Sequence, residues 1–329
     1  THKRPCPSDF RPRSLQSSWA TDPRGLQRPR TWRSHALASL LRRLTRWNNL
    51  PRRGTDIPSP TPPTYCEPLE PRRLLSVVIG ALNPGYSFHD ADGDLVTVTL
   101  KGPGSATLTL DGDAATDADL RRINMQGTTR KTKLDIKVKR QGPNGDGMTA
   151  VGFINGQSAK QLNLRDVILD EDGVHMTGSL ERFTAAELRE GADVIAEQAS
   201  GRKAQYAIDR ITSGPGFPMH NFAVISTPDE IKKLDVREDV LGLHLSGGGD
   251  GGKLRFRGDV TFSVVEFAGD VKHLGVGATS DVDVLIGGDA KKLDFTGGAV
   301  DLRTRVGGEV KELKQRGGEG SDSRCDIAG

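Results

Sequence analysis

The fold is decided by five related segments of sequence, EIKKLDV (Glu230–Val236), DGGKLRF (Asp250–Phe256), DVKHLGV (Asp270–Val276), DAKKLDF (Asp289–Phe295) and EVKELKQ (Glu309–Gln315). Each contains one leucine at the same place, and the leucines follow one another at steps of 20, 20, 19 and 20 residues. An acidic residue stands four positions before each leucine, and glycine precedes that acid in four of the five segments. A fixed period of this length predicts a stacked repeat architecture.

One repeat unit contains strand patterns and corner signals. An apolar residue follows most of the leucines at a distance of two, and a second alternating run such as Val282-x-Val284-x-Ile286 comes later in the unit. Glycine pairs separate the runs and indicate tight corners. A unit of this kind buries its apolar face only by stacking on its neighbours. The sequence therefore predicts an all-β fold, a right-handed parallel β-helix of about 20 residues per coil. Roughly eleven coils spaced about 4.8 Å apart would form a rod about 50 Å long.

Charge is distributed unevenly along the 329 residues, whose net charge is +3. Residues 1–73 contain 15 Lys and Arg against 5 Asp and Glu, so the remaining residues are net acidic. Aromatic residues make up only 5% of the chain, which suits thin β-coils better than a thick core. No apolar run approaches the roughly 18 residues that a spanning helix needs, so no transmembrane segment is predicted. Cys6, Cys66 and Cys325 fit no metal-ligand spacing, and their disulfide state cannot be inferred.

The first part of the chain is predicted to be an arm distinct from the repeats. Residues 1–68 are basic and rich in Arg and Pro, and most of them are predicted to be disordered. Within them, residues 35–49 carry leucines at helical spacing with arginines opposite. Two interpretations stay open: an amphipathic helix that contacts an anionic membrane peripherally, or a segment that forms no stable helix. No fold in the sequence supports nucleic-acid binding by these arginines.

A short motif follows the arm at residues 69–76. The residues Leu69-Glu-Pro-Arg-Arg-Leu-Leu75 resemble the LEPR-XLL motif, which is found near the N-terminus of large, repeat-rich bacterial surface proteins, mostly of planctomycetes. Every defining position of the motif matches, and the resemblance covers seven residues. It implies an exported, surface-associated protein and implies nothing catalytic. The basic stretch before the motif is longer than is usual in that family.

The rest of the chain divides by the regularity of its pattern. Residues 77–229 show strand signals at irregular intervals and are predicted to be irregular β-coils, 230–318 are the regular repeats, and 319–329 are a tail. Residues 183–198 leave two alternatives. Thr184 and Glu187 are spaced as a helix capping box, whereas Leu188 and Val194-Ile195 fit a further coil.

Three aspartates at alternate positions, Asp90, Asp92 and Asp94, are the candidate metal ligands. Their carboxylates could supply oxygens to Ca²⁺, which prefers such ligands. The segment lacks the acidic residue at the twelfth position of an EF-hand, where Lys101 stands, and this favours a solvated turn at the start of a strand. No other cofactor is predicted.

Two interpretations of the repeated acids and lysines lead to different functions. Because the same residues recur in coil after coil, a structural role is favoured over a catalytic site, which needs a unique constellation. An acid and a lysine two positions apart can pair between coils. The alternative is a carbohydrate-active β-helix enzyme, a lyase or hydrolase on acidic glycans, with candidates in the irregular part at Asp166, Asp170, Glu171, Asp172 and Arg182. The seven histidines are dispersed, so no zinc site is predicted.

The sequence thus predicts a non-enzymatic, extracellular or cell-surface protein with a structural or adhesive role. Its repetitive surface would face a surface polysaccharide, a matrix component or another protein. End-to-end stacking of uncapped coils would allow self-association.

Overall fold

The computed structural model describes residues 74–141, 143–189, 191–212, 222–316 and 323–327. Contacts divide the chain into Thr1–Pro68 and Leu69–Gly329, and all described residues belong to the second unit. The basic arm, the helix predicted over 35–49 and most of the motif therefore lie outside the described residues. Every regular element of the described residues is a β-strand, which confirms the all-β fold class.

The N-terminal and central strands are β1 (Leu74–Gly80), β2 (Gly85–His89), β3 (Leu95–Lys101), β4 (Ser105–Asp111), β5 (Asp119–Gln126), β6 (Lys133–Lys139), β7 (Thr149–Gly156), β8 (Gln161–Met176), β9 (Arg182–Arg189), β10 (Val194–Ala196), β11 (Ala204–Thr212) and β12 (Ala223–Thr227). The C-terminal strands are β13 (Ile231–Val236), β14 (Val240–Leu241), β15 (Leu243–Gly247), β16 (Gly251–Phe256), β17 (Val260–Phe267), β18 (Val271–Val276), β19 (Thr279–Ile286), β20 (Leu293–Phe295), β21 (Ala299–Val306), β22 (Leu313–Gln315) and β23 (Arg324–Ile327).

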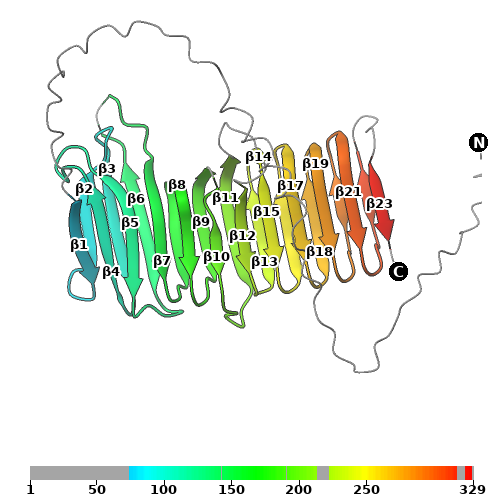
Figure 1. Ribbon diagram of the computed structural model, residues 1–329, viewed down its shortest axis with the longest axis horizontal. Coiled ribbons are helices and arrows are strands. Elements are labelled where there is room, and N and C mark those ends of the chain that lie inside the picture. Colours follow the sequence, from blue (N-terminus) through cyan, green and yellow to red (C-terminus); the bar gives the residue numbers. More distant parts are fainter. Residues whose placement is uncertain (1–73, 142, 190, 213–221, 317–322, 328–329) are drawn as a thin grey trace, which may run out of the picture. The chain divides into compact units, whose positions relative to one another are not determined.

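The leucines of the repeat stack directly on one another. Parallel pairing runs from Leu234 to Leu254, to Leu274, to Leu293 and to Leu313. The same ladder continues toward the N-terminus through Tyr206, Phe183 and Leu162. The result is a β-solenoid of about 8 turns with roughly 20 residues per coil, which Figure 1 shows as a row of parallel strands. The predicted parallel β-helix is confirmed with fewer than eleven coils, and its handedness stays a prediction.

The first six strands differ from the coils that the sequence predicted over 77–229. β1 pairs antiparallel with β4, β4 with β5, β2 with β3, and β3 with β6. Parallel stacking starts where β5 meets β7 and β6 meets β8. Alternation of apolar and polar residues is the same in antiparallel and parallel strands, so the sequence pattern did not distinguish the hairpins from the coils.

Residues 183–189 and 194–196 form strands, and the helix alternative for this region is wrong. They contribute to β9 and β10, in which Phe183 and Leu188 are fully buried and stack on Leu162 and Leu169 of β8. Burial in the stack outweighs the local capping signals, because propensity is a weak preference that tertiary context overrides.

Four successive coils of the regular part each have a corner in a left-handed backbone conformation at the same place. Gly242, Phe262, Asp281 and Asp301 all have φ between 48° and 74°. These residues follow positions that are paired between neighbouring coils, so the corners lie above one another. The corner lies after the short strand segment that follows each leucine-bearing strand, and the chain then continues along β15, β17, β19 or β21. We call the face made by β13, β16, β18, β20 and β22 the leucine face.

The core consists of these inward columns, and side-chain sizes complement one another between coils. Phe267 is 2% exposed and packs where Gly247 of the previous coil has no side chain, since a Cβ there would overlap its ring. Tyr206 packs edge to face against Phe183, with ring centroids 6.1 Å apart. Buried Leu, Val, Ile and Phe residues extend without interruption from β1 to β21.

Candidate functional site

The predicted metal ligands lie in the turn between β2 and β3, and two of the three carboxylates are buried. Asp90 is 5% exposed and Asp94 is fully buried. The backbone N–H of Asp94 donates to Oδ1 of Asp90 at 2.8 Å, which closes the turn. Burial and a hydrogen bond to Asp92 raise the pKa of Asp90 to about 7, and the same hydrogen bond lowers the pKa of Asp92. With a pKa of about 7, Asp90 is only partly ionised at neutral pH, and its proton is shared with Asp92 when it is bound.

A distant loop completes this cluster. The N–H groups of Gln141 and Gly147 each donate to one carboxylate oxygen of Asp94 at 2.6 Å, and the N–H of Asp146 donates to Asp92 at 3.0 Å. A Cβ at Gly145 would overlap Oδ1 of Asp94, so glycine is required at that position for the loop to close over the carboxylate. The negative charge of Asp94 is thus stabilised by backbone donors of the protein itself.

Three acids could hold a cation here, and they are not the three that the sequence proposed. Carboxylate oxygens of Asp92, Asp94 and Asp146 lie within 4.8 Å of one another, and the hydrogen bond between Asp90 and Asp92 raises the pKa of Asp90. Asp146 was missed because it is 52 residues beyond Asp94, and only its turn-rich setting, Asn144-Gly-Asp-Gly147, could have drawn attention to it. Three carboxylates fit a hard cation such as Ca²⁺, but the hydrogen bonds that Asp94 accepts already stabilise its charge.

The repeated acids lie at the corner before each strand of the leucine face, and they have a structural role. Oδ1 of Asp250 accepts the N–H of Asp270, Oδ1 of Asp270 accepts the N–H of Asp289, and Oδ1 of Asp289 accepts the N–H of Glu309, at 2.8–3.0 Å. Each carboxylate therefore binds the backbone of the next coil. A Cβ at Gly269, Gly288 or Gly308 would overlap these same oxygens, which explains the glycine before each acid. We call this series the aspartate ladder.

Lysines pair with these acids less than the sequence suggested. Among the described lysines that stand two positions before a repeat leucine, one ion pair is found, between Lys272 and Glu230 at 4.0 Å. Glu230 also pairs with Lys203 at 2.7 Å. The backbone competes successfully for the aspartates, because an N–H fixed by the coil geometry loses no side-chain entropy on binding, unlike a lysine.

The candidate acids of the enzymatic alternative are spread over two corners of one coil. The buried segment Val167–Leu169 separates Asp166 from Glu171 and its neighbours. Glu171 pairs with Arg121 at 3.2 Å, and Arg182 begins β9, in the next coil. The hollows described below are lined by other residues.

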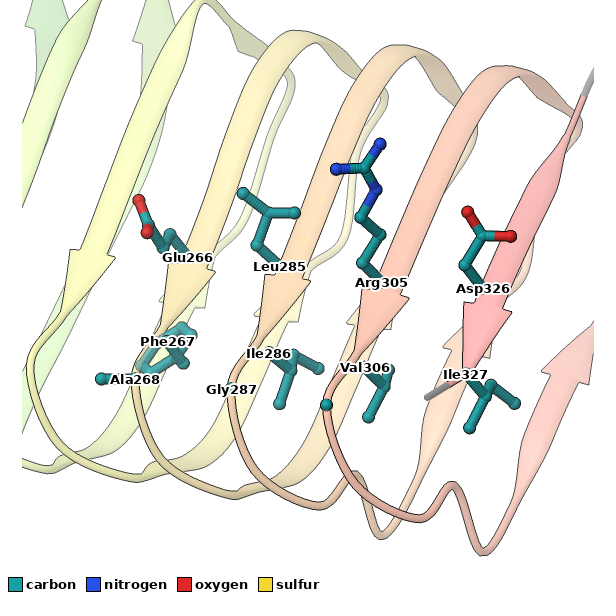
Figure 2. Close-up of a pocket in the computed structure, with 11 residues that line it drawn as sticks. Glu266, Phe267, Ala268, Leu285, Ile286, Gly287, Arg305, Val306, Asp326 and Ile327 are labelled. Atoms are coloured by element: carbon teal, nitrogen blue, oxygen red, sulfur yellow. The ribbon is translucent and has the colours of Figure 1, made fainter. Parts of the chain in front are cut away.

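Two shallow hollows interrupt the sides of the regular coils. The first has a volume of about 430 Å³ and crosses β17, β19, β21 and β23. Figure 2 shows its outer row of side chains, Glu266, Leu285, Arg305 and Asp326, which stand in register across four coils. The row beside it contains the inward Phe267, Ile286 and Val306, which are almost fully buried. The outer row contains charges of both signs, on Glu266, Arg305 and Asp326, so the hollow favours no single ligand charge.

The second hollow is a notch of about 310 Å³ on the leucine face, around Gly275. Gly275 lies between Arg255 of the previous coil and Asp294 of the next. His273 borders the notch as well. Burial lowers the pKa of His273, and the positive charges of Lys292, Arg255 and Lys253 lower it further. Three positively charged side chains and one carboxylate, that of Asp294, therefore act on His273 at the notch, within a chain segment that is net acidic. The sequence analysis missed this notch, because it considered the lysine two positions before each leucine and not the residue directly before the leucine.

Comparison of the chain with family models, with curated proteins and with solved structures gives no match. Within the described part of the chain, no helix has the length and apolar character needed to cross a membrane. Cys325 is an exposed free cysteine, whereas Cys6 and Cys66 lie outside the described residues.

Proposed function

We propose that this chain is a non-enzymatic structural or adhesive solenoid of the bacterial cell surface, which presents a repeated outer surface to an extended partner. The observation that carries the proposal is the register of the coils. Because the leucines pair one to one from coil to coil, outward residues also form straight columns with a spacing of about 4.8 Å. A flat, periodic face of this kind matches a long polymer better than a small molecule.

Export is supported by the resemblance of Leu69–Leu75 to the LEPR-XLL motif. The partner classes that we propose are a surface polysaccharide first, and a matrix or other surface protein second. Neither class requires a metal or another cofactor. The aspartate ladder supports a structural role, since it uses the repeated acids to join neighbouring coils.

An enzyme that acts on acidic polysaccharides is the second candidate. The observation that favours it is the notch, where a histidine of lowered pKa lies near the half-buried cation Arg255. A neutral histidine is a competent general base near neutral pH. Under our proposal the notch binds its ligand and leaves it intact.

One screen tests both candidates. The purified full chain is applied to an array of immobilised polysaccharides and matrix proteins, and the soluble polysaccharides are then assayed for cleavage with and without calcium. We expect binding without release of unsaturated or reducing sugar ends. Release of such ends that depends on His273 would replace the structural proposal with the enzymatic one. Binding to nothing on the array would contradict both.

Self-association by end-to-end stacking is a separate proposal. Sedimentation velocity over a range of concentrations measures it directly, and a single monomeric species at every concentration would contradict it.

A further inference from the structure

A column of basic side chains runs along the leucine face. Lys233, Lys253 and His273 pair in register on neighbouring coils, and Lys292 continues the column one position before Leu293. These residues point outward, since each precedes a buried leucine. Their spacing of about 4.8 Å follows from parallel pairing. We call these four residues the basic column.

The notch lies beside this column and is open because Gly275 has no side chain. A Cβ built on Gly275 would meet Nε2 of His273 at 3.6 Å and the carbonyl oxygen of Leu254 at 3.9 Å, both of which are ordinary contacts. The space above the glycine is therefore not filled by the protein. Phe256, Val276 and Thr296 provide the less polar part of the lining.

The positive charges around the notch differ in whether acids neutralise them. Arg257 and Lys233 both pair with the buried Asp235, at 3.0 and 3.2 Å. By contrast, no ion pair is recorded within the described residues for Lys253 or Arg255. Both lie on β16, where Arg255 lines the notch and Lys253 stands two residues before it. Lys292, directly before β20, and Asp294 of β20 act on the charge of His273 from the next coil. Lys253 and Arg255 therefore keep their capacity to bind an anion.

An acceptor without a donor lies on the opposite side of the notch. Oδ1 of Asp294 is buried and receives no hydrogen bond within the described part of the chain. Its other carboxylate oxygen lies 3.4 Å from Nζ of Lys292. A buried acceptor is costly to leave without a partner, so a rotation of the Asp294 carboxylate that brings this oxygen to a hydroxyl donor in the notch would be favourable.

We propose that the notch around Gly275 binds one negatively charged sugar residue of an acidic polysaccharide lying along the basic column. The carboxylate or sulfate group of that residue contacts Arg255 and Lys253, and a neighbouring hydroxyl group donates to Asp294. The inference deepens the proposed function, since it names the ligand class and the place where it binds.

Acidic polysaccharide fits this surface better than nucleic acid does. Nucleic-acid binding depends on neutralising many phosphates at once, whereas here Asp294 and the paired Asp235 lie among the cations. The site offers both anion-binding groups and an acceptor for hydroxyls, and sugars with an acidic group present both. No exposed aromatic residue that could stack on bases lines the notch.

Binding is measured by calorimetry on the full chain with four probes: an oligogalacturonate, its neutral methyl ester, a sulfated heparin-derived oligosaccharide, and single-stranded oligothymidylate. We expect binding of at least one acidic sugar and none of the neutral ester. The carboxylated and sulfated probes distinguish the two sources of negative charge. Tighter binding of oligothymidylate than of either acidic sugar would overturn the assignment.

Substitutions at one position test whether the notch is the site. Gly275→Glu fills it with a negative charge and is expected to weaken binding at least about tenfold, equivalent to about 1.4 kcal/mol. Gly275→Ala adds only a Cβ, which the space accepts, and controls for backbone effects. Arg255→Gln is expected to weaken binding similarly, whereas Arg303→Gln removes one exposed charge of β21 and should leave affinity unchanged. Circular dichroism establishes that each variant is folded.

The protonation of His273 provides a second readout that a merely structural role would not change. A bound anion opposes the positive potential of Lys253, Arg255 and Lys292 and is expected to raise the pKa of His273. Titration of the histidine signals by NMR, assigned with His273→Gln, measures that shift. Sugar binding that survives Gly275→Glu and leaves the pKa of His273 unchanged would place the site elsewhere, which refutes the notch and leaves the proposed function standing. Absence of binding to every acidic sugar would refute the notch and remove the glycan as partner.

Discussion

The aspartate ladder predicts that the glycine before each repeated acid cannot acquire a side chain without breaking a bond between coils. Gly288 is the clearest test, because its φ is not in the left-handed region and the effect of substitution is steric alone. In Gly288→Ala the new Cβ would overlap Oδ1 of Asp270 and lie 3.0 Å from the N atom of Asp270. The carboxylate must then move away from the N–H of Asp289, which it now accepts at 2.8 Å.

The magnitude follows from two opposing terms. Losing a hydrogen bond to a charged acceptor costs about 1.5–3 kcal/mol. Replacing glycine by alanine restores about 0.4–1 kcal/mol, because the unfolded chain loses conformational freedom. We therefore expect Gly288→Ala to lower the free energy of unfolding by about 1–2 kcal/mol. Gly298→Ala is the matched control: a Cβ there meets nothing within 4 Å, so this variant should be as stable as the parent or slightly more stable.

The assay is urea unfolding followed by circular dichroism, with hydrogen exchange at the amide of Asp289 as the local readout. Exchange at this amide should accelerate in Gly288→Ala and stay unchanged in Gly298→Ala. A double-mutant cycle with Asp270→Ala separates the steric effect from the rest, because without the carboxylate the Cβ has room. The reasoning is refuted if both alanine variants stabilise the protein equally, or if the cycle is additive.

Three further predictions concern the stack and the acid cluster. Leu274→Ala removes a fully buried side chain between two stacked leucines and should lower the free energy of unfolding by about 2–5 kcal/mol, measured by the same urea titration; a loss below 1 kcal/mol would contradict the leucine ladder. The pKa of Asp90 is raised to about 7 from an ordinary 3.8, so its contribution to stability is complete below about pH 4 and is lost as the pH rises through 7. Asp90→Asn should therefore make the unfolding midpoint depend less on pH between pH 5 and 8. A pH dependence equal to that of the parent protein would refute the shared proton. Asp94→Ala leaves the amides of Gln141 and Gly147 without their acceptor and should lower the free energy of unfolding by about 3 kcal/mol. A chelator should leave the melting temperature of the parent protein unchanged. A melting temperature that falls with chelator would show that a cation holds the cluster together.

The sequence alone determined the solenoid, because the repeat can be recognised from the residue types within each unit. A leucine every 20 residues, alternation around it and glycine at the corners suffice to predict parallel stacking, since no single unit can bury its own apolar face. The aspartates of the turn at 90–94 were also identified as a cluster from their spacing. The same alternation could not separate the antiparallel strands β1–β6 from true coils, because side-chain period does not depend on strand direction.

Tertiary structure decided which groups meet across coils. Only the folded chain brings Asp146 to Asp92 and Asp94, places the carboxylate of Asp270 on the backbone of Asp289, and leaves a notch where Gly275 follows Arg255 in the stack. Sequence gives the order of residues within a coil, whereas the register between coils sets their neighbours one turn away. That register depends on the number of residues in every corner of every coil. The side chains that meet on the outer surface are therefore set only when the whole stack is assembled.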